Sequence, residues 1–211
     1  MKAFQPRLGI LPPSQRALWP KLVAVRERFI LYGGTALALH LGHRASVDFD
    51  FFSFQPFEVE NLRRSASWIW EAETLQAEPN TLTVLHRGAE GLVKVSFFGG
   101  LTFGTVGEPE ETADGILRLA GLPDLFATKL NTVYQRAEAK DYLDIYALLK
   151  SGLSLTDGLR FSKEIYGADF NTLLPLQALC YFQEPSLREL PEEVKETLVE
   201  SVRSASPPHD G

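Results

Sequence analysis

The chain has 211 residues, of which 45% are hydrophobic and 23% charged, and its formal net charge is −6. This length accommodates one large α/β domain, or a core with a helical extension. The acidic balance gives no general attraction for polyphosphate, so a nucleic-acid partner requires a local basic patch. A single cysteine, Cys180, excludes an internal disulfide framework and a cysteine-rich zinc site. With no apolar run of about 18 residues and no secretory leader pattern, we expect a cytoplasmic protein without a membrane partner.

In chain order, hydrophobic periodicity predicts a mixed first half and a helical second half. The predicted elements of the first half are helical structure at 14–28, a strand at 29–32, a helix at 35–41, a strand at 46–52, a helix at 57–77, and strands at 81–87, 91–98 and 115–120. Within 14–28, Pro20 either opens a second helix or kinks the first. The second half is predicted to form helices at 122–150, 155–166, 171–182 and 186–203.

The fold class that follows is α+β, with a small mixed-sheet core and flanking helices, followed by a helical C-terminal part. We place the core at residues 1–108 and a linker with the helical part at 109–203. The tail at 204–211, SASPPHDG, is predicted to be disordered.

The strand predicted at 46–52 carries polar side chains at alternate positions. Because residues i and i+2 of a strand point to the same face, Arg44, Ser46, Asp48 and Asp50 project together, and the residues between them form a core face. Two carboxylates about 7 Å apart along a strand supply the oxygen ligands that Mg²⁺ prefers. The alternative is an ordinary solvent-facing surface with no ligand.

A glycine pair lies just before this strand. Gly33 and Gly34, followed by Thr35, separate the predicted strand at 29–32 from the predicted helix at 35–41. A glycine turn at the start of a helix presents free backbone N–H groups to an anion, and the helix dipole adds to the attraction. A phosphate-binding turn followed by two carboxylates is more specific than either feature alone.

The segment GGTALALHLGHRASVDFDFF resembles the first motif of the nucleotidyltransferase-like AbiEii/AbiGii toxin family, part of the polymerase-β-type nucleotidyltransferase superfamily. The resemblance implies that Gly33, Gly34 and Thr35 bind the triphosphate, with Arg44 and Ser46 beside them. It further implies that Asp48 and Asp50 hold Mg²⁺ and act in catalysis.

The segment KLNTVYQRAEAKDYLDIYALL at 129–149 resembles the later motifs of the same family. In one continuous helix, Lys129, Arg136 and Lys140 share a face. The resemblance implies that these three bind the nucleotide and that Lys129, Asp141 and Asp144 take part in catalysis. The alternative is a solvated helix face in which Lys140 pairs with Asp144 four residues later.

One position departs from the family pattern. Active polymerase-β-type enzymes usually add a third carboxylate from a later strand, and the alternation of the strand at 91–98 puts Lys94 and Ser96 on the corresponding face. A serine cannot replace a carboxylate as a base or metal ligand at neutral pH. Turnover by two metal ions is therefore in question.

The resemblance implies a Mg²⁺-dependent transfer of NMP from an NTP to an acceptor hydroxyl, such as that of a transfer RNA end. It also implies the toxin component of a toxin–antitoxin or phage-defence system, with a cognate antitoxin. Two alternatives stay open. One is a nucleotide-binding or protein-interaction module without turnover, which is favoured by Ser96 at the position of the third carboxylate. The other is a phosphotransferase or nucleotide hydrolase that uses the same residues.

Overall fold

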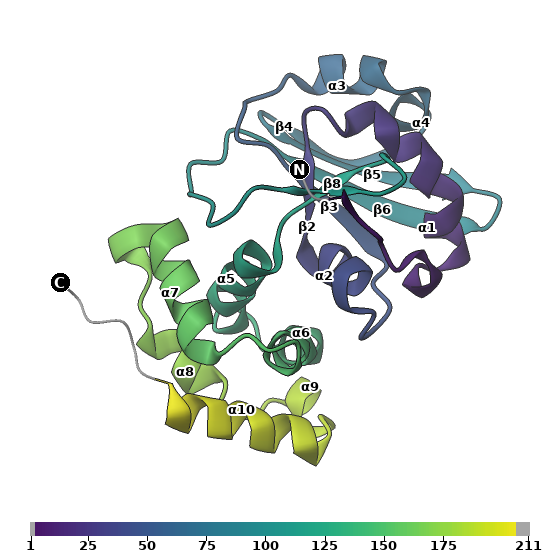
Figure 1. Ribbon diagram of the computed structural model, residues 1–211. Helices are drawn as coiled ribbons and strands as arrows, with labels where there is room; N and C mark the ends of the chain where they lie inside the picture. Colours follow the sequence, from purple (N-terminus) through teal and green to yellow (C-terminus); the bar gives the residue numbers. More distant parts are fainter. Residues whose placement is uncertain (1–2, 206–211) are drawn as a thin grey trace. The chain divides into compact units, whose positions relative to one another are not determined.

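The computed structural model describes residues 3–205, which divide into two compact units (Figure 1). The first unit holds the described residues up to Thr102 together with Glu108–Gly121, and the second holds Phe103–Gly107 and the described residues from Leu122 onward. The chain thus enters the helical unit briefly and returns to add two strands after residue 108, where the sequence places the end of the core. Of the predicted tail, residues 206–211 lie outside the described part.

The first unit is built on an eight-stranded mixed sheet with the order β1-β7-β8-β2-β3-β6-β5-β4, which confirms the predicted fold class. The strands are β1 (Ala3–Phe4), β2 (Ile30–Tyr32), β3 (Asp48–Phe52), β4 (Glu73–Glu78), β5 (Thr81–Gly88), β6 (Gly91–Phe98), β7 (Glu110–Thr112) and β8 (Arg118–Leu119). At the centre, β3 pairs antiparallel with β2 and parallel with β6.

One face of this sheet is covered by helices, and the aromatic core lies beneath them. The helices of the unit are η1 (Leu8–Ile10), α1 (Pro13–Leu18), η2 (Trp19–Val25), α2 (Gly33–Leu41), α3 (Val59–Ser65) and α4 (Ser67–Trp70). Phe51 of β3 stacks on Phe97 of β6 with ring centroids 5.3 Å apart, and Trp68 of α4 lies 6.3 Å from Phe97. Because Phe49 and Phe51 are fully buried, the alternate residues of β3 must point to the other face.

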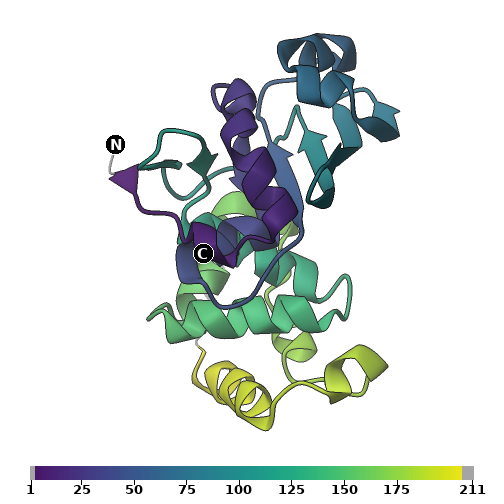
Figure 2. The same ribbon diagram turned by 90° about the vertical axis from the view of Figure 1, so that its right-hand side faces the viewer.

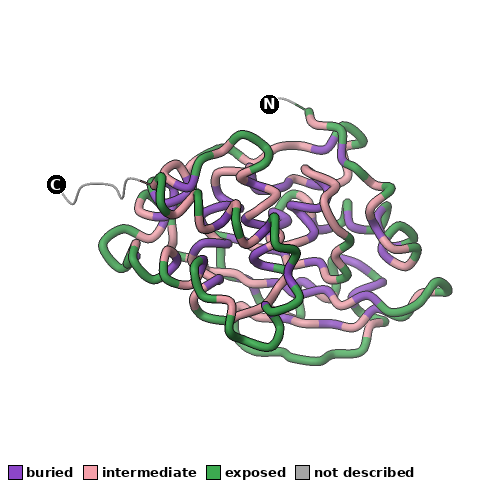
Figure 3. Tube along the Cα trace, turned by 90° about the horizontal axis from the view of Figure 1, so that it is seen from below, coloured by how far each residue is buried: buried purple, intermediate pink, exposed green. Residues whose placement is uncertain are grey.

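The second unit is helical, drawn from teal to yellow in Figures 1 and 2. Its helices are α5 (Leu122–Val133), α6 (Ala139–Lys150), α7 (Leu155–Tyr166), η3 (Gly167–Asp169), α8 (Leu173–Ala178), α9 (Pro185–Arg188) and α10 (Glu192–Ser204). Helices α5 and α7 approach closely at Gly158, where an added Cβ would lie 2.8 Å from Leu130 and 2.9 Å from Phe126. The buried positions of both units are purple in Figure 3.

The segment 103–107 is held to the second unit by the start of α5. The carboxylate of Asp124 accepts hydrogen bonds from the backbone N–H groups of Val106 (3.1 Å) and Gly107 (3.2 Å). Burial raises the pKa of Asp124, although these two hydrogen bonds oppose the rise. No helix within residues 3–205 is long and apolar enough to cross a bilayer.

Several predicted helices differ from the observed structure. The one predicted at 186–203 is two helices, because α9 ends at Arg188 and α10 begins at Glu192, after Pro191. The helical structure predicted at 14–28 is the short α1 followed by the 3₁₀ helix η2, and Pro20 lies in the first turn of η2, in agreement with one of the two predicted arrangements. The helix predicted at 57–77 is wrong beyond Trp70, since Glu73–Glu78 forms β4. All six residues of this edge strand are exposed, so it lacks the alternation that identifies a strand with one buried face.

The continuous helix predicted at 122–150 is also wrong. Helix α5 ends at Val133 and α6 begins at Ala139. In one helix, Lys129 and Asp141 would lie about 18 Å apart along the axis. Their side chains instead form an ion pair of 2.7 Å, which requires the chain to turn between them.

Candidate functional site

Two aspartates of β3 form the centre of the candidate site in the first unit. Asp48 and Asp50 alternate with the buried Phe49 and Phe51, so both carboxylates lie on the face of β3 opposite the aromatic core, where they are half-buried. This confirms the shared face predicted from the alternation. In the sheet, Asp50 lies opposite Tyr32, the last residue of β2.

The glycine pair brings the start of α2 against this acidic face. Gly33 has φ +73°, and a Cβ at this position would lie 2.9 Å from Oδ2 of Asp50. A Cβ on Gly34 would lie 2.7 Å from an Nη2 of Arg44 and 3.0 Å from Oγ of Ser46. At Gly33 the positive φ together with the short distance to Asp50 favours glycine. Five of the predicted site residues therefore meet around the first turn of α2.

Thr35, which was predicted to bind the triphosphate, makes a side-chain contact within the first unit. Its side chain is buried, and its hydroxyl donates a hydrogen bond to the backbone carbonyl of Asp48. The hydroxyl therefore ties α2 to β3. The first turn of α2 has no side-chain cap, so its backbone N–H groups are available to an anion.

Strand β6 carries a serine and a lysine on the face where the family pattern has a third carboxylate. Ser96 is buried opposite Asp50, and Lys94 lies opposite Asp48. The Nζ of Lys94 is 3.1 Å from Oδ2 of Asp48, with side chains 42% and 36% exposed. Because β6 lies between β3 and β5, Lys94 does not cover a sheet edge.

The oxygen donors fit one divalent cation. Asp48 and Asp50 offer partly exposed carboxylates, and Mg²⁺ binds few protein carboxylates and takes its other ligands from water and phosphate. Within the described residues, no group of three or more His, Cys, Asp or Glu side chains is placed to hold a metal. The donor set therefore does not fit a pair of metals held by protein carboxylates alone.

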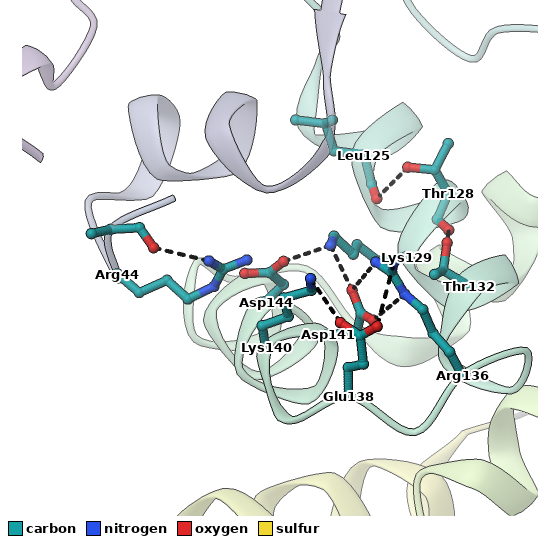
Figure 4. A network of polar contacts seen from close by, with 11 residues as sticks. Arg44, Leu125, Thr128, Lys129, Thr132, Arg136, Glu138, Lys140, Asp141 and Asp144 are labelled. Carbon is teal, nitrogen blue, oxygen red and sulfur yellow. Dashed lines mark hydrogen bonds and ion pairs between the residues drawn. The ribbon is translucent and has the colours of Figure 1, made fainter. Parts of the chain in front are cut away.

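A second polar cluster lies in the helical unit (Figure 4). The Nζ of Lys129 on α5 is 2.7 Å from Oδ1 of Asp141 and 2.7 Å from Oδ2 of Asp144, both on α6. The two carboxylates are fully buried and the lysine side chain is 7% exposed. Arg136, in the turn between the helices, donates from Nε to Oδ2 of Asp141 at 2.9 Å. These four charges sum to zero.

The predicted common face of Lys129, Arg136 and Lys140 is absent. Lys129 is buried, whereas the Arg136 side chain is 45% exposed and Lys140 is half-exposed, with its Nζ 2.7 Å from Glu138. The alternative pairing of Lys140 with Asp144 is wrong too, because Asp144 is buried against Lys129. Both errors follow from the turn at residues 134–138, which a continuous helical pattern does not reveal.

Residues 16–210 match the family described as "Nucleotidyl transferase AbiEii toxin, Type IV TA system". An uncharacterized protein of Aquifex aeolicus is 32% identical over 180 residues, which cover 82% of this chain and 84% of that protein.

Solved structures are similar in fold. The nucleotidyltransferase toxin MenT4 from Mycobacterium tuberculosis matches with a TM-score of 0.63 at 16% identity, over 90% of this chain and 80% of that one. JHP933 from Helicobacter pylori matches with a TM-score of 0.58 at 17% identity, over 92% of this chain and 89% of that one.

Proposed function

The chain belongs to the AbiEii family of nucleotidyltransferase toxins, and we propose that it transfers NMP from an NTP to an acceptor hydroxyl with Mg²⁺ as its cofactor. The observation that carries this proposal is the close approach of the uncapped α2 start to the acidic face of β3. A phosphate-binding turn and two carboxylates suited to a cation occupy one place in the first unit. A transfer RNA end is the proposed acceptor, and a cognate antitoxin the proposed partner.

In the first unit, one set of groups binds phosphate and another binds the cation. The N–H groups of the first turn of α2 bind the triphosphate, aided by the helix dipole and by Arg44 and Ser46 beside Gly34. Asp48 and Asp50 would hold Mg²⁺, which supplies charge stabilisation to the phosphoryl group when bound. Thr35 positions Asp48 by holding the backbone of β3.

In the second unit, Lys129 and Arg136 are the cations proposed to bind phosphate. A lysine ammonium has three N–H donors, and Lys129 uses two of them on Asp141 and Asp144. One donor remains for a phosphate oxygen. Asp141 also fixes Arg136, the more exposed cation of the cluster. Lys140, bound to Glu138, is left as a surface charge that screens phosphate weakly.

The proposal is tested by incubating the purified protein with each α-³²P-labelled NTP, Mg²⁺ and total cellular RNA, with EDTA in a parallel reaction. We expect label in RNA with one or a few NTPs and none with EDTA. Label transferred only from γ-³²P-NTP would show a phosphotransferase, and release of labelled phosphate to water a hydrolase. Either result would overturn the proposal.

Ser96 and Lys94 favour a second candidate, a nucleotide-binding module without turnover. They leave the acidic face with one carboxylate fewer and one cation more than the family pattern predicts. Mg²⁺-dependent NTP binding with no label in RNA, protein or small acceptors would favour this reading over transfer.

Lys94 is expected to compete with Mg²⁺ for Asp48. Its Nζ lies 3.1 Å from the Asp48 carboxylate, and partly exposed ion pairs of this kind contribute about 0.2–1 kcal/mol. Lys94→Met should therefore lower the half-saturating Mg²⁺ concentration by up to about fivefold. Mg²⁺ titration followed by thermal shift measures this. Lys150→Met, which removes an exposed lysine near Glu193 in the other unit, should leave the Mg²⁺ response unchanged, and an equal response of both variants would count against competition.

Gly33 is expected to tolerate no side chain without loss of activity. Gly33→Ala strains a residue at φ +73° by about 1–2 kcal/mol and drives its Cβ to 2.9 Å from Oδ2 of Asp50. Moving that carboxylate should reduce label transfer on the order of 10²-fold. Gly167→Ala is the control, because Gly167 also has a positive φ (+62°) but no atom within 4 Å of an added Cβ. Strain alone explains the loss if Gly167→Ala reduces transfer equally.

A further inference from the structure

The helical unit contains a pocket of about 470 Å³, and Arg136 is the one residue of its lining that the proposed function uses. Its walls come from the turn after α5, from α6, from α8 and from the segment after α8. We name it the tyrosine pocket. Its lining includes Tyr134, Arg136, Leu174, Gln177, Tyr181 and Glu184. A volume of this size accommodates one small molecule or one nucleotide.

Tyr142 also lines the tyrosine pocket and is uncharged. Tyr142 of α6 is buried, and its hydroxyl donates to the backbone carbonyl of Ala178 at 3.0 Å. Burial raises the pKa of Tyr142 to about 12, and the charges of Asp141 and Glu184 add to the rise. The tyrosine therefore stays protonated at neutral pH and holds α6 to α8.

Other residues that line the pocket expose aromatic and apolar surface to solvent. The side chain of Tyr181 is 52% exposed and that of Leu174 is 38% exposed. The Tyr134 ring is partly exposed, and its hydroxyl is fixed by a 2.7 Å hydrogen bond to Asn131. Exposed aromatic rings beside a pocket are the usual platforms on which an unpaired base stacks.

Polar groups at the rim suit the edges of such a base and its phosphate. Arg136 lines the pocket while Asp141 holds its Nε at 2.9 Å, so its guanidinium is ordered before any ligand arrives. Gln177 offers both an amide donor and an acceptor, and Glu184 offers an acceptor for an amino group. A wholly anionic ligand is disfavoured by Glu184, and an apolar ligand leaves Arg136 and Gln177 without a role.

We propose that the tyrosine pocket binds an unpaired nucleobase, stacked on Tyr181, with the adjoining phosphate on Arg136. This inference rests on the proposed function and deepens it, because it places base recognition in the helical unit. The base belongs either to the single-stranded end of an acceptor RNA or to the NTP, and the experiment separates these two sources.

The experiment measures binding and not transfer. The full-length protein is titrated into a fluorescein-labelled, single-stranded RNA hexamer of mixed sequence at fixed salt, and separately into a fluorescent NTP analogue with Mg²⁺. Tyr181→Ala should weaken the binding of one of these ligands roughly 5- to 150-fold, the range for losing one base-stacking ring. Tyr181→Phe keeps the ring and should bind as the wild type does.

Tyr146→Ala is the matched control, because Tyr146 lies outside the tyrosine pocket and its hydroxyl bonds to Glu193. A loss confined to the RNA assigns the pocket to the acceptor, and a loss confined to the NTP analogue assigns it to the donor base. Equal binding of both ligands by wild type and Tyr181→Ala overturns the inference, even if the wild type transfers label to RNA. Tyr181-dependent binding without any transfer by the wild type leaves the inference standing and rejects the proposed reaction.

Discussion

Replacing Lys129 with methionine is expected to lower the free energy of unfolding of the helical unit by about 3–5 kcal/mol. The lysine side chain is 7% exposed and lies 2.7 Å from each of two fully buried carboxylates. Its removal takes away the ammonium that both buried carboxylates contact, while Arg136 still pairs with Asp141. Breaking a buried ion pair from one side is costly because the remaining charge keeps its desolvation penalty.

Denaturant unfolding followed by circular dichroism measures the loss. Lys140→Met is the control, since the Lys140–Glu138 pair is half-exposed and its removal should cost less than about 1 kcal/mol. Lys129→Met combined with Asp144→Asn should recover part of the lost stability, because the variant pair buries one negative charge fewer. A cost for Lys129→Met no larger than that for Lys140→Met would show that the cluster does not stabilise the unit.

The part of the site on β3 was predictable because its chemistry follows a local period. Burial of Phe49 and Phe51 fixes the opposite face for Asp48 and Asp50, and both facts are visible as alternation in five residues. The glycine turn is local in the same way. The close approach of Gly33 to Asp50 was not predicted, because it depends on how β2 and β3 pair.

The part of the site on α5 and α6 was not predictable from period alone. Residues 134–138 consist of residues compatible with a helix, so the pattern gave no sign of the turn there. The turn is favoured by a contact between side chains twelve residues apart, Lys129 and Asp141. The strand β4 was not predicted for a related reason: it lies at the end of the sheet beside β5, and all six of its residues are exposed.

Replacing Asp48 with asparagine is expected to reduce label transfer on the order of 10³-fold. A bound cation contributes several kcal/mol of charge stabilisation to phosphoryl transfer, and each 1.4 kcal/mol is a factor of ten in rate. The asparagine keeps the size of the side chain but loses the charge that attracts Mg²⁺. Stability should change by less than about 1 kcal/mol, because the Asp48–Lys94 pair is partly exposed and the neighbouring Asp50 is relieved of a like charge.

Glu111→Gln separates the loss of the site from the loss of an ion pair. Glu111 on β7 lies 2.6 Å from Arg26, and its side chain is 27% exposed, so this variant also neutralises a partly exposed acid within the first unit. Label transfer by Glu111→Gln should equal that of the wild type, whereas its melting temperature should fall at least as far as that of Asp48→Asn. The opposite pattern would be a strongly destabilised Asp48→Asn variant whose melting temperature still rises with Mg²⁺. That result would give Asp48 a structural role and show that other residues bind the cation.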